Sequence, residues 1–240
     1  MSGAEKAGES EVAAAPGNQA ACWKCGKPAG TGHFCHECGA IQPLPRGTDY
    51  FAMLGLPRKL WIEMEGLETR FHQLSWKLHP DNFVRASAEE REMSLERSSQ
   101  LNDAYRALRD PVSRVEYLLG LAGMRKEGTT KQQAPPELLE EVFELNERLD
   151  ELRSARAAHE EGAEMAALRK RLEEAAHGFE ERLADVDAQL MAAAREWDAT
   201  VDTGDAAGGR AALARMNEIL NRRSYIRNLV RGVTQELEQG

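Results

Sequence analysis

Four cysteines of the chain have the spacing of metal ligands. Cys22 and Cys25 form one C-x-x-C pair. Cys35 and Cys38 form a second pair, and a glycine follows each of the two. Two such pairs can surround one ion, and the glycine allows the positive φ that brings backbone N–H groups toward the sulfurs. Four thiolates suit a structural Zn²⁺ site, so residues 21–41 are predicted to form a zinc-knuckle module.

Other interpretations of the four cysteines stay open from sequence alone. A mononuclear iron site uses the same ligands, and His33 or His36 could replace one thiolate. Two disulfides are disfavoured because the sequence shows no export signal. A module of this size has no hydrophobic core and would need its metal to fold. The proline-containing connector at 40–48 predicts that the module and the rest of the chain have separate cores.

The tripeptide His79-Pro80-Asp81 is the second chemically distinctive motif. Proline lacks a backbone N–H and restricts the residue before it, so the tripeptide is expected in a stiff loop that ends a helix. The preceding stretch carries one apolar stripe at helical spacing: Leu67, Phe71, Leu74 and Leu78. Ser87 and Glu90 have the spacing of a capping box, which predicts the start of a second helix.

No catalytic apparatus accompanies these motifs. The sequence contains no P-loop, no G-x-S-x-G motif and no free cysteine beside a base. His79 could be imagined as a general base, but no carboxylate or nucleophile at catalytic spacing supports that role. We therefore expect a protein that acts by binding and not as an enzyme.

Composition indicates a soluble, helical protein of 240 residues, with 42% hydrophobic and 30% charged residues. No apolar run approaches the roughly 18 residues that a membrane span needs. Residues 1–20 contain acids and no apolar signal segment, which predicts a disordered leader and a cytoplasmic location. Residues 137–240 hold 23 acids against 14 bases, and this acidic balance argues against nucleic-acid binding.

Hydrophobic periodicity predicts two helical units joined by a linker. Residues 49–124 contain a short helix followed by helices at 59–78 and 88–108, and the linker is the polar stretch 125–136. The second unit is expected to be an antiparallel bundle, because it has few turn signals. Its three predicted helices, before and after a glycine-containing loop at 202–209, cover residues 137–157, 160–197 and 211–237.

A helical wheel of the first bundle helix separates two apolar faces. The core stripe consists of Leu138, Val142, Leu145, Leu149 and Leu152. Leu139 and Phe143 lie about 100–140° away from that stripe. The acidic residues that adjoin them are Glu140, Glu144, Glu147 and Glu151. An apolar pair beside aligned carboxylates is typical of a docking surface, and the alternative is that Leu139 and Phe143 widen the core contact.

Taken together, these segments resemble the HscB family, the J-domain co-chaperones of iron–sulfur cluster assembly. The matching segments are DYFAMLGLP from Asp49, HPDNF from His79, LNDAYRALRDPVSRVEYLL from Leu101 and LLEEVFELNERLDEL from Leu138. Generic DnaJ proteins share the HPD motif but lack the other segments. The cysteine module resembles that of the mitochondrial members, and Glu140 departs from an apolar residue that the family tends to have.

The resemblance implies an all-α fold: a J-domain helical hairpin at 49–124, an antiparallel three-helix bundle at 137–240 and a small N-terminal zinc-knuckle module. The hairpin would engage an HscA/DnaK-type chaperone and trigger its ATPase through His79, Pro80 and Asp81, with Arg70 and Lys77 steering the encounter. The bundle would bind an IscU-type scaffold through Leu139, Phe143, Glu144, Glu147 and Glu151. Ile219 on the last helix is a weaker candidate.

Two other functions stay compatible with the sequence. One is a J-domain adaptor that delivers a different client to a DnaK-type chaperone. The other is a redox or metal sensor that works through the cysteines. The knuckles could also mediate a homodimer.

Overall fold

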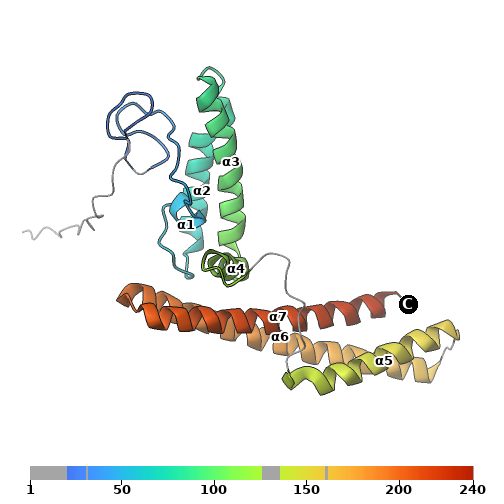
Figure 1. Cartoon of the computed structure of the whole chain (residues 1–240). Helices are drawn as coiled ribbons and strands as arrows, with labels where there is room; N and C mark the ends of the chain where they lie inside the picture. Colours follow the sequence, from blue (N-terminus) through green and yellow to red (C-terminus); the bar gives the residue numbers. More distant parts are fainter. Residues whose placement is uncertain (1–20, 31, 126–135, 160–161, 240) are drawn as a thin grey trace, which may run out of the picture.

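The computed structural model describes residues 21–239 apart from 31, 126–135 and 160–161, and its regular structure there is helical (Figure 1). The leader predicted at 1–20 and nearly all of the predicted linker lie outside the described residues. A helical hairpin stands across a long, nearly horizontal bundle, and the cysteine module lies beside the hairpin (Figure 1). The all-α prediction is confirmed.

The hairpin consists of α2 (Met64–Leu78) and α3 (Ala88–Arg109), with the short α1 (Tyr50–Met53) packed against α3. The turn η1 (Pro80–Phe83) joins the two long helices. The predicted capping box of Ser87 starts α3. The first long helix begins later than the predicted residue 59, because the side chain of Glu63 accepts hydrogen bonds from the first backbone N–H groups of α2.

The fourth helix of the hairpin unit, α4 (Pro111–Leu121), lies on the bundle (Figure 1). Its buried Val115, Leu118 and Leu119 belong to the same hydrophobic core as the long bundle helices. Asp198 of the bundle accepts hydrogen bonds from the backbone N–H groups of Leu60 and Trp61, each at 2.7 Å. One shared core and a buried charged hydrogen-bond acceptor therefore fix the hairpin relative to the bundle.

The bundle contains α5 (Leu139–Ala157), α6 (Ala163–Thr203) and α7 (Ala206–Glu238). The predicted end of its second helix at 197 and the predicted loop at 202–209 are wrong. The turn contains only Gly204, in the left-handed region with φ 69°, and Asp205, which caps α7. Gly209 lies inside α7, where an added Cβ would be 3.3 Å from Trp197, so it allows close packing.

The cysteine module is not independent of the hairpin, contrary to the sequence-based expectation. It has a small buried cluster of its own, which consists of Cys22, Ala29 and Cys35. Ile41 is fully buried in the hairpin core beside residues such as Phe51 and Leu101. Phe34 and Leu44 pack against the same cluster. The module has too few apolar residues to cover these side chains itself, so the hairpin covers them.

Among the described residues, no helix combines the length and the apolar character that crossing a bilayer requires.

Candidate functional site

The HPD loop presents its imidazole and carboxylate to solvent. His79 ends α2, and the exposed fractions of the His79 and Asp81 side chains are 56% and 85%. The backbone N–H of Asp81 donates to Nδ1 of His79 at 3.3 Å, and Nδ1 lies 3.5 Å from Oδ2 of Asp81. The backbone N–H of Asn82 donates to the carbonyl of His79 at 2.9 Å. These local bonds order the loop while leaving its polar atoms accessible.

Two hydroxyl groups of α3 anchor the residue that precedes the HPD loop. Ser94 and Ser98 donate to the carbonyl oxygen of Leu78, the residue before His79, at 2.7 and 3.0 Å. The side-chain amide of Asn82 donates to the carbonyl of Trp76 at 2.6 Å. The loop is therefore anchored both to the end of α2 and to the neighbouring helix.

The outer face of α2 carries basic and apolar groups. Trp76 and Lys77 lie within one turn of this loop, whereas Arg70 lies about two and a half turns before it. Arg70 and Lys77 are exposed, and Nη1 of Arg70 donates to the carbonyl of Gly55 at 3.3 Å. Trp76 is 78% exposed, and the sequence-based reasoning did not select it. The available signal was a tryptophan outside the apolar stripe of this helix, one residue before Lys77.

The four cysteine sulfurs converge on one point, all within 4.8 Å of one another. The Sγ atoms of Cys22 and Cys38 are 3.6 Å apart, and those of Cys25 and Cys35 are 3.8 Å apart. A tetrahedral zinc ion with bonds of about 2.3 Å requires sulfurs about 3.8 Å apart, so the four residues fit the metal. His33 does not belong to this cluster, because its ring hydrogen bonds with the carbonyl of Met53 at 2.8 Å.

Three N–H groups point at the sulfur of Cys22. The backbone N–H groups of Lys24 and Cys25 lie 3.4 and 3.5 Å from it, and the side-chain amide of Gln42 lies 3.3 Å from it. Burial raises the pKa of Cys22, but the two backbone N–H groups and the neighbouring thiols outweigh burial and lower this pKa to about 6. Cys22 thus favours the thiolate, the form that binds a metal. At Cys38 a backbone hydrogen bond from Ala40 lowers the pKa, but burial and hydrogen bonds with the neighbouring thiols outweigh it and raise this pKa to about 12.

The exposed side of α5 agrees with the helical wheel. Leu139 and Phe143 are 54% and 65% exposed. The predicted core residues Leu138, Leu145, Leu149 and Leu152 are buried, and Val142 is partly buried against the same core. The alternative that the apolar pair widens the core contact is therefore wrong. With Glu147 and Glu151, which are also exposed, the pair forms a row at a spacing of four residues, which we call the α5 row.

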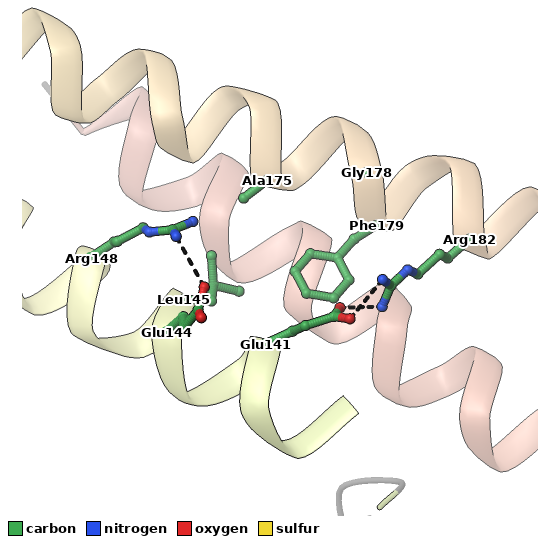
Figure 2. Close-up of a pocket in the computed structure, with 8 residues that line it drawn as sticks. All are labelled: Glu141, Glu144, Leu145, Arg148, Ala175, Gly178, Phe179 and Arg182. Carbon is green, nitrogen blue, oxygen red and sulfur yellow. Dashed lines mark hydrogen bonds and ion pairs between the residues drawn. The ribbon is translucent and has the colours of Figure 1, made fainter. Parts of the chain in front are cut away.

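Glu144 lies apart from the α5 row. It lines a groove of about 200 Å³ between α5 and α6, and its carboxylate is 3.0 Å from Nη2 of Arg148 (Figure 2). Glu141 and Arg182 form a second ion pair in this groove (Figure 2). Ile219 is only 6% exposed and belongs to the bundle core, so it offers little surface to a partner.

Comparison with known proteins gives consistent results, although no family model matches the sequence. The chain is 37% identical over 153 residues to the iron–sulfur cluster co-chaperone protein HscB of Mus musculus, covering 62% of this chain and 65% of that protein. It is 36% identical over 155 residues to the co-chaperone protein HscB homolog of Bordetella avium, covering 62% and 89%. The match thus spans just under two thirds of the length of the mouse relative.

The crystal structure of human co-chaperone protein HscB is similar over 90% of this chain and 97% of that one. The TM-score is 0.58 and the sequence identity 28%. Chaperone HscB from Vibrio cholerae gives a TM-score of 0.52 at 25% identity, over 80% of this chain and 99% of that one.

Proposed function

Because the chain belongs to the HscB family of co-chaperones, we propose that it supports iron–sulfur cluster assembly by bringing a cluster scaffold to a DnaK-type chaperone. The observation that carries this proposal is the presence of two exposed surfaces on one firmly connected framework. The HPD loop lies at the tip of the hairpin, and the α5 row lies on the bundle.

The chaperone surface would consist of the HPD loop and the outer face of α2. His79 and Asp81 offer a donor and an acceptor at fixed positions, and Arg70 and Lys77 would attract an acidic chaperone surface. The exposed ring of Trp76 would add apolar contact area next to them. ATP hydrolysis would take place in the chaperone, and this chain would act by binding.

The scaffold surface would be the α5 row. Leu139 and Phe143 would enter an apolar recess of the scaffold, and Glu147 and Glu151 would pair with basic groups beside that recess. Among the described residues, neither glutamate has an ion-pair partner, so both carboxylates can pair with another protein. Glu144 would contribute less, because it already pairs with Arg148.

A steady-state ATPase assay tests the two surfaces together. We expect the chain to stimulate a DnaK-type chaperone alone, and an IscU-type scaffold to raise the stimulation further at limiting co-chaperone. An unrelated client protein serves as the control. Stimulation that the scaffold does not change would favour an adaptor for a different client, and a complete lack of stimulation would refute the proposal.

The cysteine module would hold one structural zinc ion between Cys22, Cys25, Cys35 and Cys38, leaving no position for a substrate. We expect elemental analysis of the purified protein to give one zinc per chain and thiol titration to find no disulfide. A Cys25→Ser variant should lose most of the metal, whereas His36→Ala should keep it. Stoichiometric iron in place of zinc would instead support the redox-sensor alternative.

A further inference from the structure

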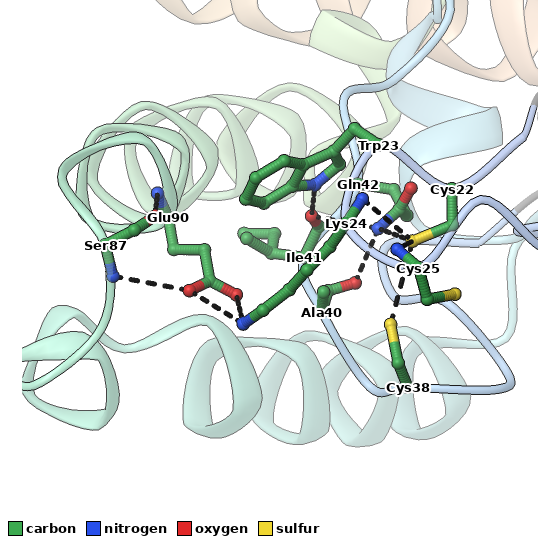
Figure 3. Close-up of polar contacts among 10 residues, drawn as sticks. All are labelled: Cys22, Trp23, Lys24, Cys25, Cys38, Ala40, Ile41, Gln42, Ser87 and Glu90. Carbon is green, nitrogen blue, oxygen red and sulfur yellow. Dashed lines mark hydrogen bonds and ion pairs between the residues drawn. The ribbon is translucent and has the colours of Figure 1, made fainter.

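Lys24 of the cysteine module contacts the start of α3. Its Nζ lies 2.9 and 3.2 Å from the two carboxylate oxygens of Glu90, whose side chain is only 8% exposed (Figure 3). The same carboxylate accepts the backbone N–H of Ser87 at 3.3 Å and so completes the capping box of α3 (Figure 3). A residue between two metal-ligand positions thus supports the first turn of the helix that follows the HPD loop.

Gln42 makes a second connection two turns further along α3. Its side-chain amide donates to the sulfur of Cys22 at 3.3 Å, and its backbone carbonyl accepts Nη2 of Arg97 at 3.5 Å. Arg97 is buried, and its Nε and Nη1 have no hydrogen-bond partner among the described residues. If the carbonyl of Gln42 moved away, the buried guanidinium would lose its acceptor, which is costly for a charged group.

The face of α3 that meets the module also holds the HPD loop. The hydroxyl groups of Ser94 and Ser98 bind the carbonyl of Leu78 immediately before His79. One face of α3 carries Glu90, Ser94, Arg97 and Ser98. Ser94 follows Glu90 by four residues, Arg97 follows Ser94 by three and Ser98 follows Ser94 by four, and residues at these spacings lie on the same side of a helix. Contacts to the cysteine module therefore alternate with contacts to the loop along about two turns of one helix.

We propose that the cysteine module positions the HPD loop through α3. Lys24 and Gln42 are the positioning residues, and the bound metal keeps both of them in place. The module's own buried cluster consists only of Cys22, Ala29 and Cys35, so the module needs the metal to hold Cys22 and the neighbouring Lys24 in place.

Without the metal, Glu90 would lose the ammonium group of Lys24 and Arg97 would lose the carbonyl of Gln42. The hydrogen bonds from Ser94 and Ser98 to the carbonyl of Leu78 would then be held less firmly. The consequence for ATPase stimulation rests on the proposed function, whereas the effect on α3 does not.

Hydrogen exchange of the full chain, measured by mass spectrometry before and after zinc removal with a chelator and a reductant, tests the metal dependence. We expect at least tenfold faster exchange of the backbone amides in residues 79–98 after removal. The centre of α6 should exchange at an unchanged rate, which shows that the protein has not unfolded globally. Equal exchange in residues 79–98 in the two samples would overturn the proposal.

A pair of lysine variants tests the positioning role while all four thiols are retained. Lys24→Ala should speed exchange in residues 87–94 at least threefold and lower the stimulation of a DnaK-type ATPase by a similar factor, with zinc content unchanged. Lys27→Ala is the matched control, because Lys27 makes an ion pair of the same length, 2.9 Å, with exposed Glu37 inside the module. Identical behaviour of the two variants would overturn the role of Lys24.

The outcomes separate this inference from the proposed function. If zinc removal loosens α3 but the zinc-loaded wild-type chain stimulates no DnaK-type ATPase, the positioning role stands and the proposed function fails. If the zinc-free chain stimulates the chaperone as well as the loaded chain does, the positioning role fails and the proposed function stands.

Discussion

A His79→Gln variant is expected to lose stimulation of a DnaK-type ATPase while keeping the helix content and unfolding temperature of the wild type. The imidazole is more than half exposed, and among the described residues its polar contacts are with Asp81 in the same loop. Its loss opens no cavity, and exposed substitutions usually change the free energy of unfolding by no more than about 0.5 kcal/mol. The backbone bonds that shape the loop, including the one from Asn82 to the carbonyl of residue 79, do not need the ring.

Steady-state ATPase rates and circular dichroism measure the two halves of this prediction. His177→Gln is the matched control, because His177 is an exposed histidine of α6 in the bundle and lies outside the proposed chaperone surface. The control should stimulate the chaperone as the wild type does. Wild-type stimulation by the His79 variant would mean that the HPD loop is not the chaperone-binding element.

Local sequence signals were sufficient to predict the hairpin and the exposed side of α5. A capping box involves residues three apart, and Ser87 with Glu90 marks the start of α3 correctly. The exposure of Leu139 and Phe143 follows from helical periodicity alone, since it only requires knowing which other positions form the core.

Contacts between distant segments could not be predicted in this way. Lys24 and Glu90 are 66 positions apart, and no periodic pattern connects a zinc-knuckle residue with a helix cap. The connector at 40–48 resembles a spacer because of its prolines, yet Ile41 is buried in the hairpin core. The same limit applies to Gly209. Its residue type is typical of a loop, and only the structure shows that it lies in a helix and packs against Trp197 of the neighbouring helix.

The double variant Leu139→Ala, Phe143→Ala is expected to weaken binding of an IscU-type scaffold at least tenfold. A docked leucine and a docked aromatic ring typically contribute more than about 1 kcal/mol each, and about 1.4 kcal/mol corresponds to a tenfold change in Kd. Both side chains are more than half exposed in the free chain, so the free energy of unfolding should fall by no more than about 0.5 kcal/mol per substitution.

Two control variants on α5 test whether the effect belongs to the α5 row. Glu144→Gln should bind the scaffold nearly as the wild type does, because Glu144 lies in the groove and pairs with Arg148. Leu145→Ala should instead lower the free energy of unfolding by about 2–5 kcal/mol, because Leu145 is 2% exposed in the core.

Calorimetric titration of each variant with scaffold, urea unfolding and ATPase rates without scaffold give the required measurements. The double variant should stimulate the chaperone normally without scaffold, because the HPD loop belongs to the hairpin and α5 belongs to the bundle. Normal scaffold binding by a stably folded double variant would remove the α5 row as the docking surface. If the same variant also stimulated the chaperone normally, the chain would still act on a DnaK-type chaperone. The adaptor for a different client would then be the favoured function.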